Sequence, residues 1–384
     1  MNESLINEII TKYDTPTYVF DINELVNRIK YLRENLPSKV HICYAIKANT
    51  FIVKDVEKYV DRFEVCSPGE YEICREQEID YNKIFISGVN KTTASIKRVL
   101  DSSEVRLFSV ESLNQYKLLK ETNQKIKVIL RLTHGNQFGV NEEDIIRIIK
   151  ENENHSEIEI VGLQYFTGTQ KTSIKKLKRE LDYLDSFIEK IKNDLGFEFE
   201  ELEFGTGFPV YYFEDNKFDE DDFMKQFSAI ISNMNYKGKI VLEIGRSIVA
   251  SCGYYLTRVI DVKTNSNENF AIVDGGINHI TYYGQFMAMK IPKIDIWPKK
   301  KEAKEEKWNV CGSLCTINDI LVKQFSTQTL DIGDVLVFNN VGAYSMTEGL
   351  SLFLSRDLPA ILKINQDGSI KTIRKITPTY MLNM

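Results

Sequence analysis

The sequence has few of the residues that build disulfide frameworks or metal sites. It contains six cysteines and four histidines in 384 residues. No two cysteines form a Cys-x-x-Cys pair, and the histidines show no metal-ligand spacing. We therefore expect neither a disulfide-stapled module nor a zinc site.

Long hydrophobic runs and an excess of positive charge are also missing. No basic segment followed by an apolar one stands near the first residue, and no apolar run approaches the roughly 20 residues that span a membrane. We expect neither secretion nor membrane insertion, and a cytoplasmic location. The formal net charge of -6 argues against nucleic-acid binding. Three consecutive lysines, at 299–301, fall in a polar stretch, Pro298 to Lys307, that we expect to be an exposed loop.

The remaining composition is that of an ordinary globular protein, with 43% hydrophobic and 27% charged residues. The length suits two domains, or one large barrel with an appendage.

Short β-like runs alternate with amphipathic helical stretches from Lys39 to Arg246. Eight strands, each followed by a helix, is the number that closes a parallel barrel. The eight runs are Val40–Ile46, Arg62–Cys66, Ile84–Ser87, Val105–Val110, Ile126–Leu132, Ile160–Phe166, Glu201–Phe204 and Ile240–Ile244.

After Arg246 the β-like runs are separated by turn clusters, with few helical stretches between them, which predicts a mostly antiparallel β domain. These runs are Tyr254–Val262, Phe270–Val273, Val335–Phe338 and Ala360–Ile364, and Thr17–Phe20 is expected to add a strand. We predict a (β/α)8 barrel over residues 21–250, followed by a β domain over 251–384 that also takes up a strand from residues 1–20.

Lys47 stands where the first barrel strand ends. The apolar residues before it are typical of a buried strand, and Asn49 is a good terminator. Desolvation there would lower the pKa of the ammonium and make a neutral amine available to attack a carbonyl. Most lysines at strand ends extend into water instead, so other residues must decide between the two interpretations.

Two glycine turns follow the seventh and eighth runs, at Gly205-Thr206-Gly207 and Gly245-Arg246. Glycines end strands in any barrel, but these two loops are where barrel phosphate sites commonly lie. Their backbone N–H groups could cradle a phosphate. An amine for a carbonyl and a site for a phosphate on one face indicate pyridoxal 5'-phosphate.

At this point the chain resembles the decarboxylases of diaminopimelate, ornithine and arginine, which share the alanine racemase fold (fold type III). The matching segments follow the family's order from about residue 16 to about residue 360. They are Tyr44-Ala-Ile-Lys47-Ala-Asn, Glu64-Val-Cys-Ser-Pro-Gly-Glu70, Val110-Glu-Ser, Gln137-Phe-Gly, Gly168-Thr-Gln, Phe204-Gly-Thr-Gly-Phe, Glu243-Ile-Gly-Arg246-Ser, Val273-Asp-Gly-Gly-Ile-Asn, Cys311-Gly-Ser-Leu-Cys315 and Gly342-Ala-Tyr344.

The resemblance implies a role for each matching residue. Lys47 would hold the cofactor through a Schiff base, and Glu243 would keep the pyridine nitrogen protonated. Cys315 would come from the partner subunit of a homodimer and deliver a proton to the substrate carbon. The phosphate would be bound by Gly205, Gly207, Gly245, Arg246 and Tyr344. Structural alternatives stay open: Glu243 as a salt-bridge partner, Cys315 as a small buried residue and Tyr344 as a core aromatic.

Four positions depart from the family pattern. Phe166 replaces the histidine that stacks on the cofactor ring, and a phenyl face can stack but cannot donate a hydrogen bond. Thr206 replaces the middle glycine of the phosphate turn, and Ile244 replaces a proline. Thr316 replaces the acid that meets the distal amino group of the substrate, and the stretch 277–290 lacks the arginine of diaminopimelate decarboxylases.

These departures predict an amino acid or amino-acid conjugate, free or carrier-bound, whose distal end is neither a plain ammonium nor the carboxylate of diaminopimelate. The alternative is that a nearby acid, Asp319 or Glu348, binds the distal ammonium. An amino-acid racemase of the same fold and a catalytically inactive regulator are the other functions considered. Glu243 argues against the first, since the racemases place an arginine there, and Lys47 with Cys315 argues against the second.

Overall fold

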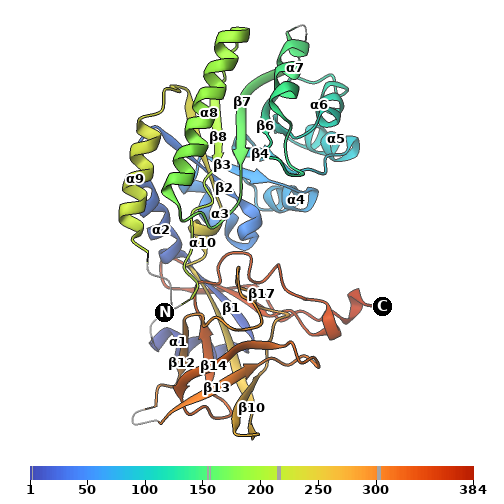
Figure 1. Ribbon diagram of the computed structural model, residues 1–384. Helices are drawn as coiled ribbons and strands as arrows, with labels where there is room; N and C mark the ends of the chain where they lie inside the picture. The colour runs from blue at the N-terminus through green and yellow to red at the C-terminus, as the bar shows by residue number, and fades with distance from the viewer. Residues whose placement is uncertain (2, 154, 156, 214–217, 301–303) are drawn as a thin grey trace. The chain divides into compact units, whose positions relative to one another are not determined.

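The computed structural model describes residues 1, 3–153, 155, 157–213, 218–300 and 304–384 (Figure 1). The chain forms two compact units. The barrel unit comprises Ile29–Pro209 and Phe218–Ile248. The β unit comprises Met1–Arg28, Val210–Lys217 and Val249–Met384.

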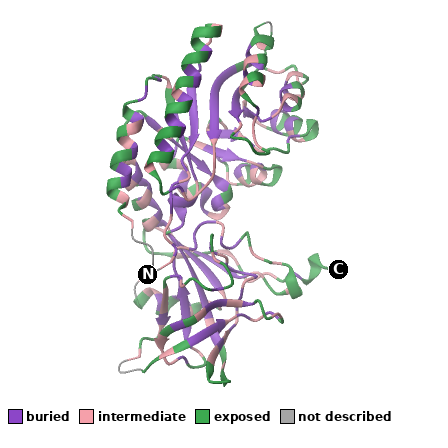
Figure 2. Ribbon diagram, viewed as in Figure 1, coloured by how far each residue is buried: buried purple, intermediate pink, exposed green. Residues whose placement is uncertain are grey.

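Eight parallel strands close the barrel in chain order, which confirms the predicted fold class. The last strand pairs with the first, with Ile244 opposite Tyr44. All eight predicted runs form these strands, and their side chains are largely buried (Figure 2). The strands are β2 (Val40–Ala45), β3 (Arg62–Val65), β4 (Ile84–Ile86), β5 (Leu107–Val110), β6 (Ile126–Leu132), β7 (Ile158–Phe166), β8 (Glu201–Gly205) and β9 (Lys239–Ile244).

Several of the helices around the barrel begin after a residue whose side chain caps the helix. Ser67, Asn141 and Asp219, for example, each accept a hydrogen bond from the third backbone N–H of their helix. The helices are α2 (Ile22–Asn35), α3 (Val53–Val56), α4 (Pro68–Glu76), α5 (Thr93–Ser102), α6 (Leu113–Lys120), α7 (Glu142–Asn152), α8 (Ile174–Leu195), α9 (Glu220–Ser232) and α10 (Arg246–Val249).

The longest of these, α8, ends at Gly196, which adopts the left-handed conformation (φ 65°) that favours glycine. It buries one apolar face, which includes Leu177, Leu181 and Leu184, and leaves its charged face exposed. Along the parts of the chain that the structure describes, no helix combines the length and apolar character needed to cross a membrane.

The β unit is a mostly antiparallel sheet preceded by α1 (Glu3–Lys12). As predicted, the run at Thr17–Phe20 joins it, because β1 pairs antiparallel with β10 and parallel with β16. The order β14-β13-β11-β10-β1-β16-β17 is extended by β15, which pairs with β10 and β12. The strands are β1 (Thr17–Asp21), β10 (Gly253–Asn265), β11 (Glu268–Val273), β12 (Ile294–Trp297), β13 (Glu305–Cys311), β14 (Ile320–Gln328), β15 (Val335–Phe338), β16 (Ala360–Ile364) and β17 (Ile370–Arg374).

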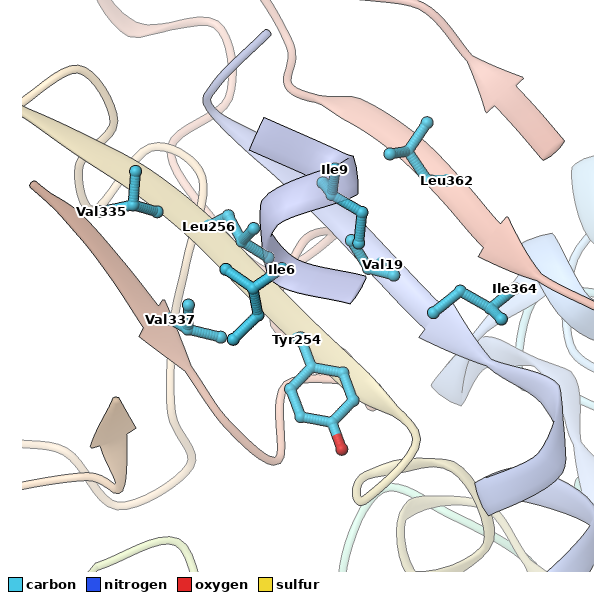
Figure 3. Packing of buried hydrophobic residues seen from close by; sticks show 9 residues of the cluster. All are labelled: Ile6, Ile9, Val19, Tyr254, Leu256, Val335, Val337, Leu362 and Ile364. Carbon is cyan, nitrogen blue, oxygen red and sulfur yellow. The ribbon is translucent and has the colours of Figure 1, made fainter. Parts of the chain in front are cut away.

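Helix α1 covers the centre of this sheet. Its buried residues Ile6 and Ile9 pack on side chains from four strands (Figure 3). The strand residues of this cluster are Val19, Tyr254, Leu256, Val335, Val337, Leu362 and Ile364. The spacing of three positions from Ile6 to Ile9 places both on one helix face, so the first and last parts of the chain share one core.

The polar stretch at residues 298–307 is an exposed loop only in part. Pro298 and Lys299 are exposed, and residues 301–303 lie outside the described residues. The ammonium of Lys300, however, is 2.8 Å from a carboxylate oxygen of Asp331 and 2.7 Å from one of Asp334. Glu305 to Lys307 begin β13 and pair with β14. The expectation of a loop is wrong there, because these first residues of β13 pair with β14 alone, whereas β11 pairs with β13 only from Trp308 on, and charged side chains suit a stretch whose backbone pairs on one side.

Candidate active site

Lys47 lies at the carboxyl end of the barrel, in the short 3-10 turn Ile46–Ala48 that follows β2. Its Nζ atom is 2.7 Å from Oε2 of Glu64 and 3.8 Å from Oε1 of Glu243. Register explains the cluster, because Glu64 on β3 stands opposite Ala45 and Glu243 on β9 stands opposite Cys43. The Lys47 side chain is 40% exposed, so the expected desolvation of its ammonium is wrong. Carboxylates, rather than apolar groups, surround it.

The two carboxyl groups share one ammonium. Burial disfavours the charged form of both. At Glu64 the Lys47 ammonium outweighs burial and lowers the carboxyl pKa. At Glu243 burial, reinforced by the negative charge of Glu64, raises the carboxyl pKa despite Lys47. The two carboxyl groups titrate as a coupled pair, and the opposite directions of their pKa shifts favour an ionised Glu64 and a protonated Glu243.

Gln164 on β7 orients Glu243 from inside the barrel. Its Nε2 donates to Oε2 of Glu243 at 3.1 Å, and its side chain is fully buried. Its Oε1 has no hydrogen-bond partner among the described residues. A buried acceptor without a partner is uncommon in a protein interior, and it marks a place where a ligand donor or a water fits.

The turn after β8 has glycine at both ends for steric reasons. A Cβ atom on Gly205 would lie 2.2 Å from Cδ2 of Phe166, so the phenyl ring packs directly on the turn. A Cβ on Gly207 would lie 2.2 Å from the carbonyl oxygen of Gly168, and its φ of 58° is left-handed. The middle residue, Thr206, is fully buried.

Thr206 contacts β9. Its N–H and its hydroxyl are 3.4 and 3.5 Å from the carbonyl oxygen of Glu243, so this N–H is already engaged. The N–H groups of Gly207 and Gly245 make no hydrogen bond within the described residues, and they are the amides available to an anion. Arg246, next along the chain, donates from Nε to the hydroxyl of Thr169 at 3.3 Å.

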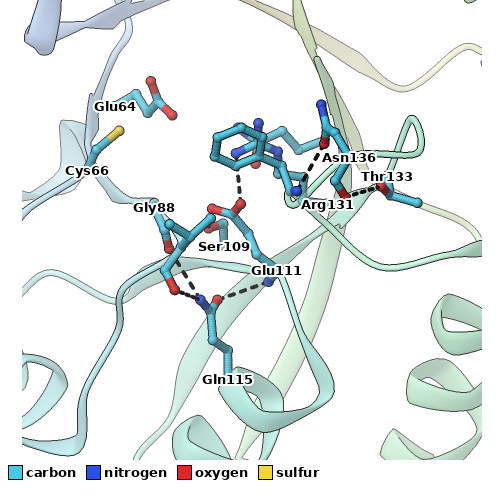
Figure 4. A network of polar contacts seen from close by, with 12 residues as sticks. Glu64, Cys66, Gly88, Ser109, Glu111, Gln115, Arg131, Thr133 and Asn136 are labelled. Carbon is cyan, nitrogen blue, oxygen red and sulfur yellow. Dashed lines mark hydrogen bonds and ion pairs between the residues drawn. The ribbon is translucent and has the colours of Figure 1, made fainter. Parts of the chain in front are cut away.

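A second buried network holds the loops after β4, β5 and β6 (Figure 4). Arg131 donates to Oε2 of Glu111 at 2.9 Å. Lys91 donates to the carbonyl of Gly88 at 2.6 Å and to the hydroxyl of Ser109 at 2.8 Å. Burial lowers the Lys91 pKa to about 8. The positive charge of Arg131 also favours the ionised forms of Glu64 and Glu243.

Three residues of this site were not predicted individually: Gln164, Glu64 as the partner of Lys47, and a buried Lys171. Lys171 pairs with Glu180 at 2.7 Å and contacts the turn at Gly205. The sequence could have predicted Glu64 as the partner of Lys47, because an acid at the end of the neighbouring strand faces the same rim of the barrel. The partners of Lys171 lie nine and 34 residues away, and no sequence spacing marks them.

The remaining predicted site residues lie in the β unit, between β13 and β14 and after β15. Cys315 is exposed, which excludes the alternative of a small buried residue. Thr316 is half-buried and accepts a hydrogen bond from the N–H of Asn318 at 3.4 Å. Tyr344 is half-buried with φ of 63°, and Glu348, four residues on, is exposed.

Asp319 holds the loop that carries Cys315 and Thr316. Its carboxylate is buried and accepts from the N–H of Ile277 at 2.8 Å and from that of Leu314 at 2.7 Å. Burial nevertheless raises its pKa. Both oxygens face the backbone of their own unit, which is the arrangement of a structural carboxylate.

The amino end of the barrel has a different character. A cavity of about 510 Å³ there is lined by residues that begin strands, including Arg62, Glu201 and Lys239, and it contains none of the predicted site residues. Arg62 pairs with Glu201 at 2.8 Å and with the fully buried Glu203 at 2.7 Å. Among the described residues, no three His, Cys, Asp or Glu side chains are grouped as metal ligands.

The carboxyl end fits pyridoxal phosphate. It offers an accessible amine at Lys47, a buried carboxyl at Glu243, an acceptor without a partner at Gln164, and a glycine turn with free N–H groups. A closed βα barrel with this rim is suited to binding a phosphate-bearing cofactor beside an accessible amine. The chain belongs to the pyridoxal-dependent decarboxylases, whose pyridoxal-binding domain matches residues 22–250. Its cofactor is pyridoxal phosphate.

Individual relatives agree with this assignment over nearly the full length. The diaminopimelate decarboxylase of Aquifex aeolicus (strain VF5) is 28% identical over 397 residues, covering 96% of this chain and 91% of that protein. The L-glutamyl acyl-carrier-protein decarboxylase of Niallia circulans is 25% identical, covering 98% and 94%. The crystal structure of diaminopimelate decarboxylase from Helicobacter pylori complexed with L-lysine has a TM-score of 0.85 at 22% identity, covers 98% of both chains and shares the fold.

Proposed function

We propose that this enzyme decarboxylates an amino acid or amino-acid conjugate with pyridoxal phosphate held by Lys47. The observation that carries the proposal is the position of the Lys47 amine, between Glu64 and Glu243 at the barrel rim. Pyridoxal phosphate, when bound, supplies an electron sink for the pair of electrons left on the substrate carbon when carbon dioxide departs. The protein supplies binding, orientation and the movement of protons.

In the barrel unit, Glu243 shares a proton with the pyridine nitrogen, and Gln164 keeps its carboxyl group in place. A carboxyl group at this position, in place of an arginine, favours decarboxylation over racemisation. Phe166 offers a phenyl face to the ring. The phosphate binds to the N–H groups of Gly207 and Gly245 and to Arg246, while Gly205 and Thr206 shape the turn.

In the β unit, Cys315 delivers a proton from its thiol to the substrate carbon, and Tyr344 contributes its hydroxyl to phosphate binding. We infer a homodimer in which Cys315 serves the barrel of the partner subunit. Support comes from large apolar side chains exposed in the β unit, among them Ile317, which is 91% exposed and two residues from Cys315. Other exposed apolar residues are Tyr283, Phe286, Met287, Met289, Leu350, Leu352, Phe353 and Leu354.

The substrate ends in a group other than a free ammonium. Thr316 offers a hydroxyl where the resemblance leads one to expect an acid. Relatives of this chain act on different substrates: one is a diaminopimelate decarboxylase and another decarboxylates a carrier-bound glutamyl group. A substrate whose side chain is neutral, acylated or attached to a carrier can lie beside Thr316 without leaving a charge unpaired.

Borohydride reduction of the purified protein tests the central assignment. Reduction followed by digestion and mass spectrometry should find a pyridoxyl group on Lys47 and on no other lysine. Lys47→Ala should give no adduct, whereas Lys91→Ala, which removes another lysine of the barrel rim, should leave the Lys47 adduct in place. An adduct on a different lysine, or none in the wild type, contradicts the proposal.

A further inference from the structure

Lys171 donates hydrogen bonds to both ends of the turn after β8. Its backbone N–H donates to the carbonyl of Gly207 at 2.8 Å, and its Nζ donates to the carbonyl of Gly205 at 3.3 Å. Its Cε lies 3.2 Å from where a Cβ on Gly207 would stand. One residue of the loop after β7 thus fixes the turn that follows β8.

The ammonium of Lys171 is a buried charge with one counter-charge. Its side chain is 3% exposed, and Glu180 on α8, 9% exposed, accepts from Nζ at 2.7 Å. The ring centroids of Phe204 and Phe166 lie 5.1 and 5.8 Å from Nζ. The cation is the member of the ion pair that contacts the turn, so the pair presents its positive end there. Because water is largely excluded, this charge is weakly screened.

We propose that Lys171 is a positioning residue of the phosphate site, which fixes the Gly205–Gly207 turn and places a positive charge behind it. The charge strengthens binding of the cofactor's phosphate group and has no effect on its aldehyde, which is the task of Lys47. The inference rests on the proposed role of the turn in phosphate binding. It gives the buried pair of Lys171 and Glu180 a function, although an apolar pair would be equally stable or more so.

Two ligands that differ only in the phosphate test the inference. The full-length protein, resolved from its cofactor, is titrated with pyridoxal phosphate and with pyridoxal. The variant carries Lys171→Met together with Glu180→Gln, so that no buried charge is left unpaired. Its affinity for pyridoxal phosphate should fall by about tenfold or more, the value of one hydrogen bond to a charged group, while its affinity for pyridoxal stays within about twofold. The matched control removes the exposed pair on the same helix, with Lys178→Met and Asp182→Asn, and should change neither affinity.

If the variant loses the same amount of affinity for pyridoxal phosphate and for pyridoxal, Lys171 has only a structural role and the inference is wrong. If neither affinity changes, the inference is also wrong. If this double variant fails to fold, Lys171→Gln together with Glu180→Gln gives the same test, because the amide at position 171 carries no charge and again no buried charge is left unpaired. A wild type that binds both ligands equally would refute the phosphate site as well. Loss of the Lys47 adduct, in contrast, would refute the proposed function and is read from the separate borohydride experiment.

Discussion

At the scale of single residues, we propose that residues of the β unit limit which substrates the enzyme accepts. Thr316 carries no charge, and Asp319 directs both carboxylate oxygens at backbone N–H groups of its own unit. Glu348 is exposed and remains the one acid of those considered that is not committed to the loop. A buried ammonium without a carboxylate partner costs several kcal/mol, on the order of a thousandfold or more in rate.

Free diamino acids should therefore be poor substrates. We expect carbon dioxide release from ornithine, lysine and meso-diaminopimelate to be on the order of a thousandfold slower, in kcat/KM, than from forms acylated on the side chain. Efficient turnover of a free diamino acid that is lost in Glu348→Gln would contradict this. Asp319→Asn is the less informative variant, because it also disturbs the loop that carries Cys315.

At the scale of elements, β3 and β8 place a cluster of charged side chains, Arg62, Glu201 and Glu203, at the amino end of the barrel. Burial raises the pKa of Glu203 to about 7, although Arg62 opposes the shift. In the unfolded chain this carboxyl titrates near its ordinary value of 4.5. The folded state therefore holds the proton more tightly, so the stabilisation is complete below about pH 4.5 and is lost as the pH rises through about 7.

Glu203→Gln should flatten this part of the pH profile. Between pH 5 and 8 the free energy of unfolding of the wild type should fall relative to that of the variant by up to ~3 kcal/mol, measured by urea unfolding. The control Glu159→Gln replaces an exposed carboxylate of β7 and should follow the wild type. Parallel profiles for Glu203→Gln and the wild type would show that Glu203 is ionised in the folded protein throughout this range.

The sequence predicts the barrel strands well because parallel strands buried on both faces are continuous apolar runs. It predicts β13 and β17 poorly, since segments such as Glu305–Cys311 and Ile370–Arg374 mix charged and apolar residues without a clear period. Motif order predicts Lys47, Glu243 and the glycine turn. The pairing of Lys171 with Gly205 depends on how two loops approach each other, and no local pattern encodes that approach.

At the scale of the whole molecule, the proposed homodimer makes a quantitative prediction. Lys47→Ala and Cys315→Ala should each be inactive alone. After subunit exchange, half of the dimers are mixed and each has one intact site, so about a quarter of the wild-type activity should return. Lys47→Ala mixed with the double variant Lys47→Ala/Cys315→Ala should stay inactive. No recovery, in a sample where native mass spectrometry detects mixed dimers, would exclude shared sites.

The place of β1 in the sheet has a consequence for how the protein is made. This strand is synthesised before the barrel, yet both strands that flank it, β10 and β16, are synthesised only after the entire barrel. Nascent β1, which includes Val19, therefore has no strand partner at this stage. The strands of the barrel pair in chain order, so the barrel can fold as the chain emerges. The sheet around β1 is complete only once β16 has been synthesised. A chain released before β10 carries β1 as an unpaired apolar strand, and one released between β10 and β16 carries it with one open edge. Such edges are the kind that chaperones bind and that aggregate.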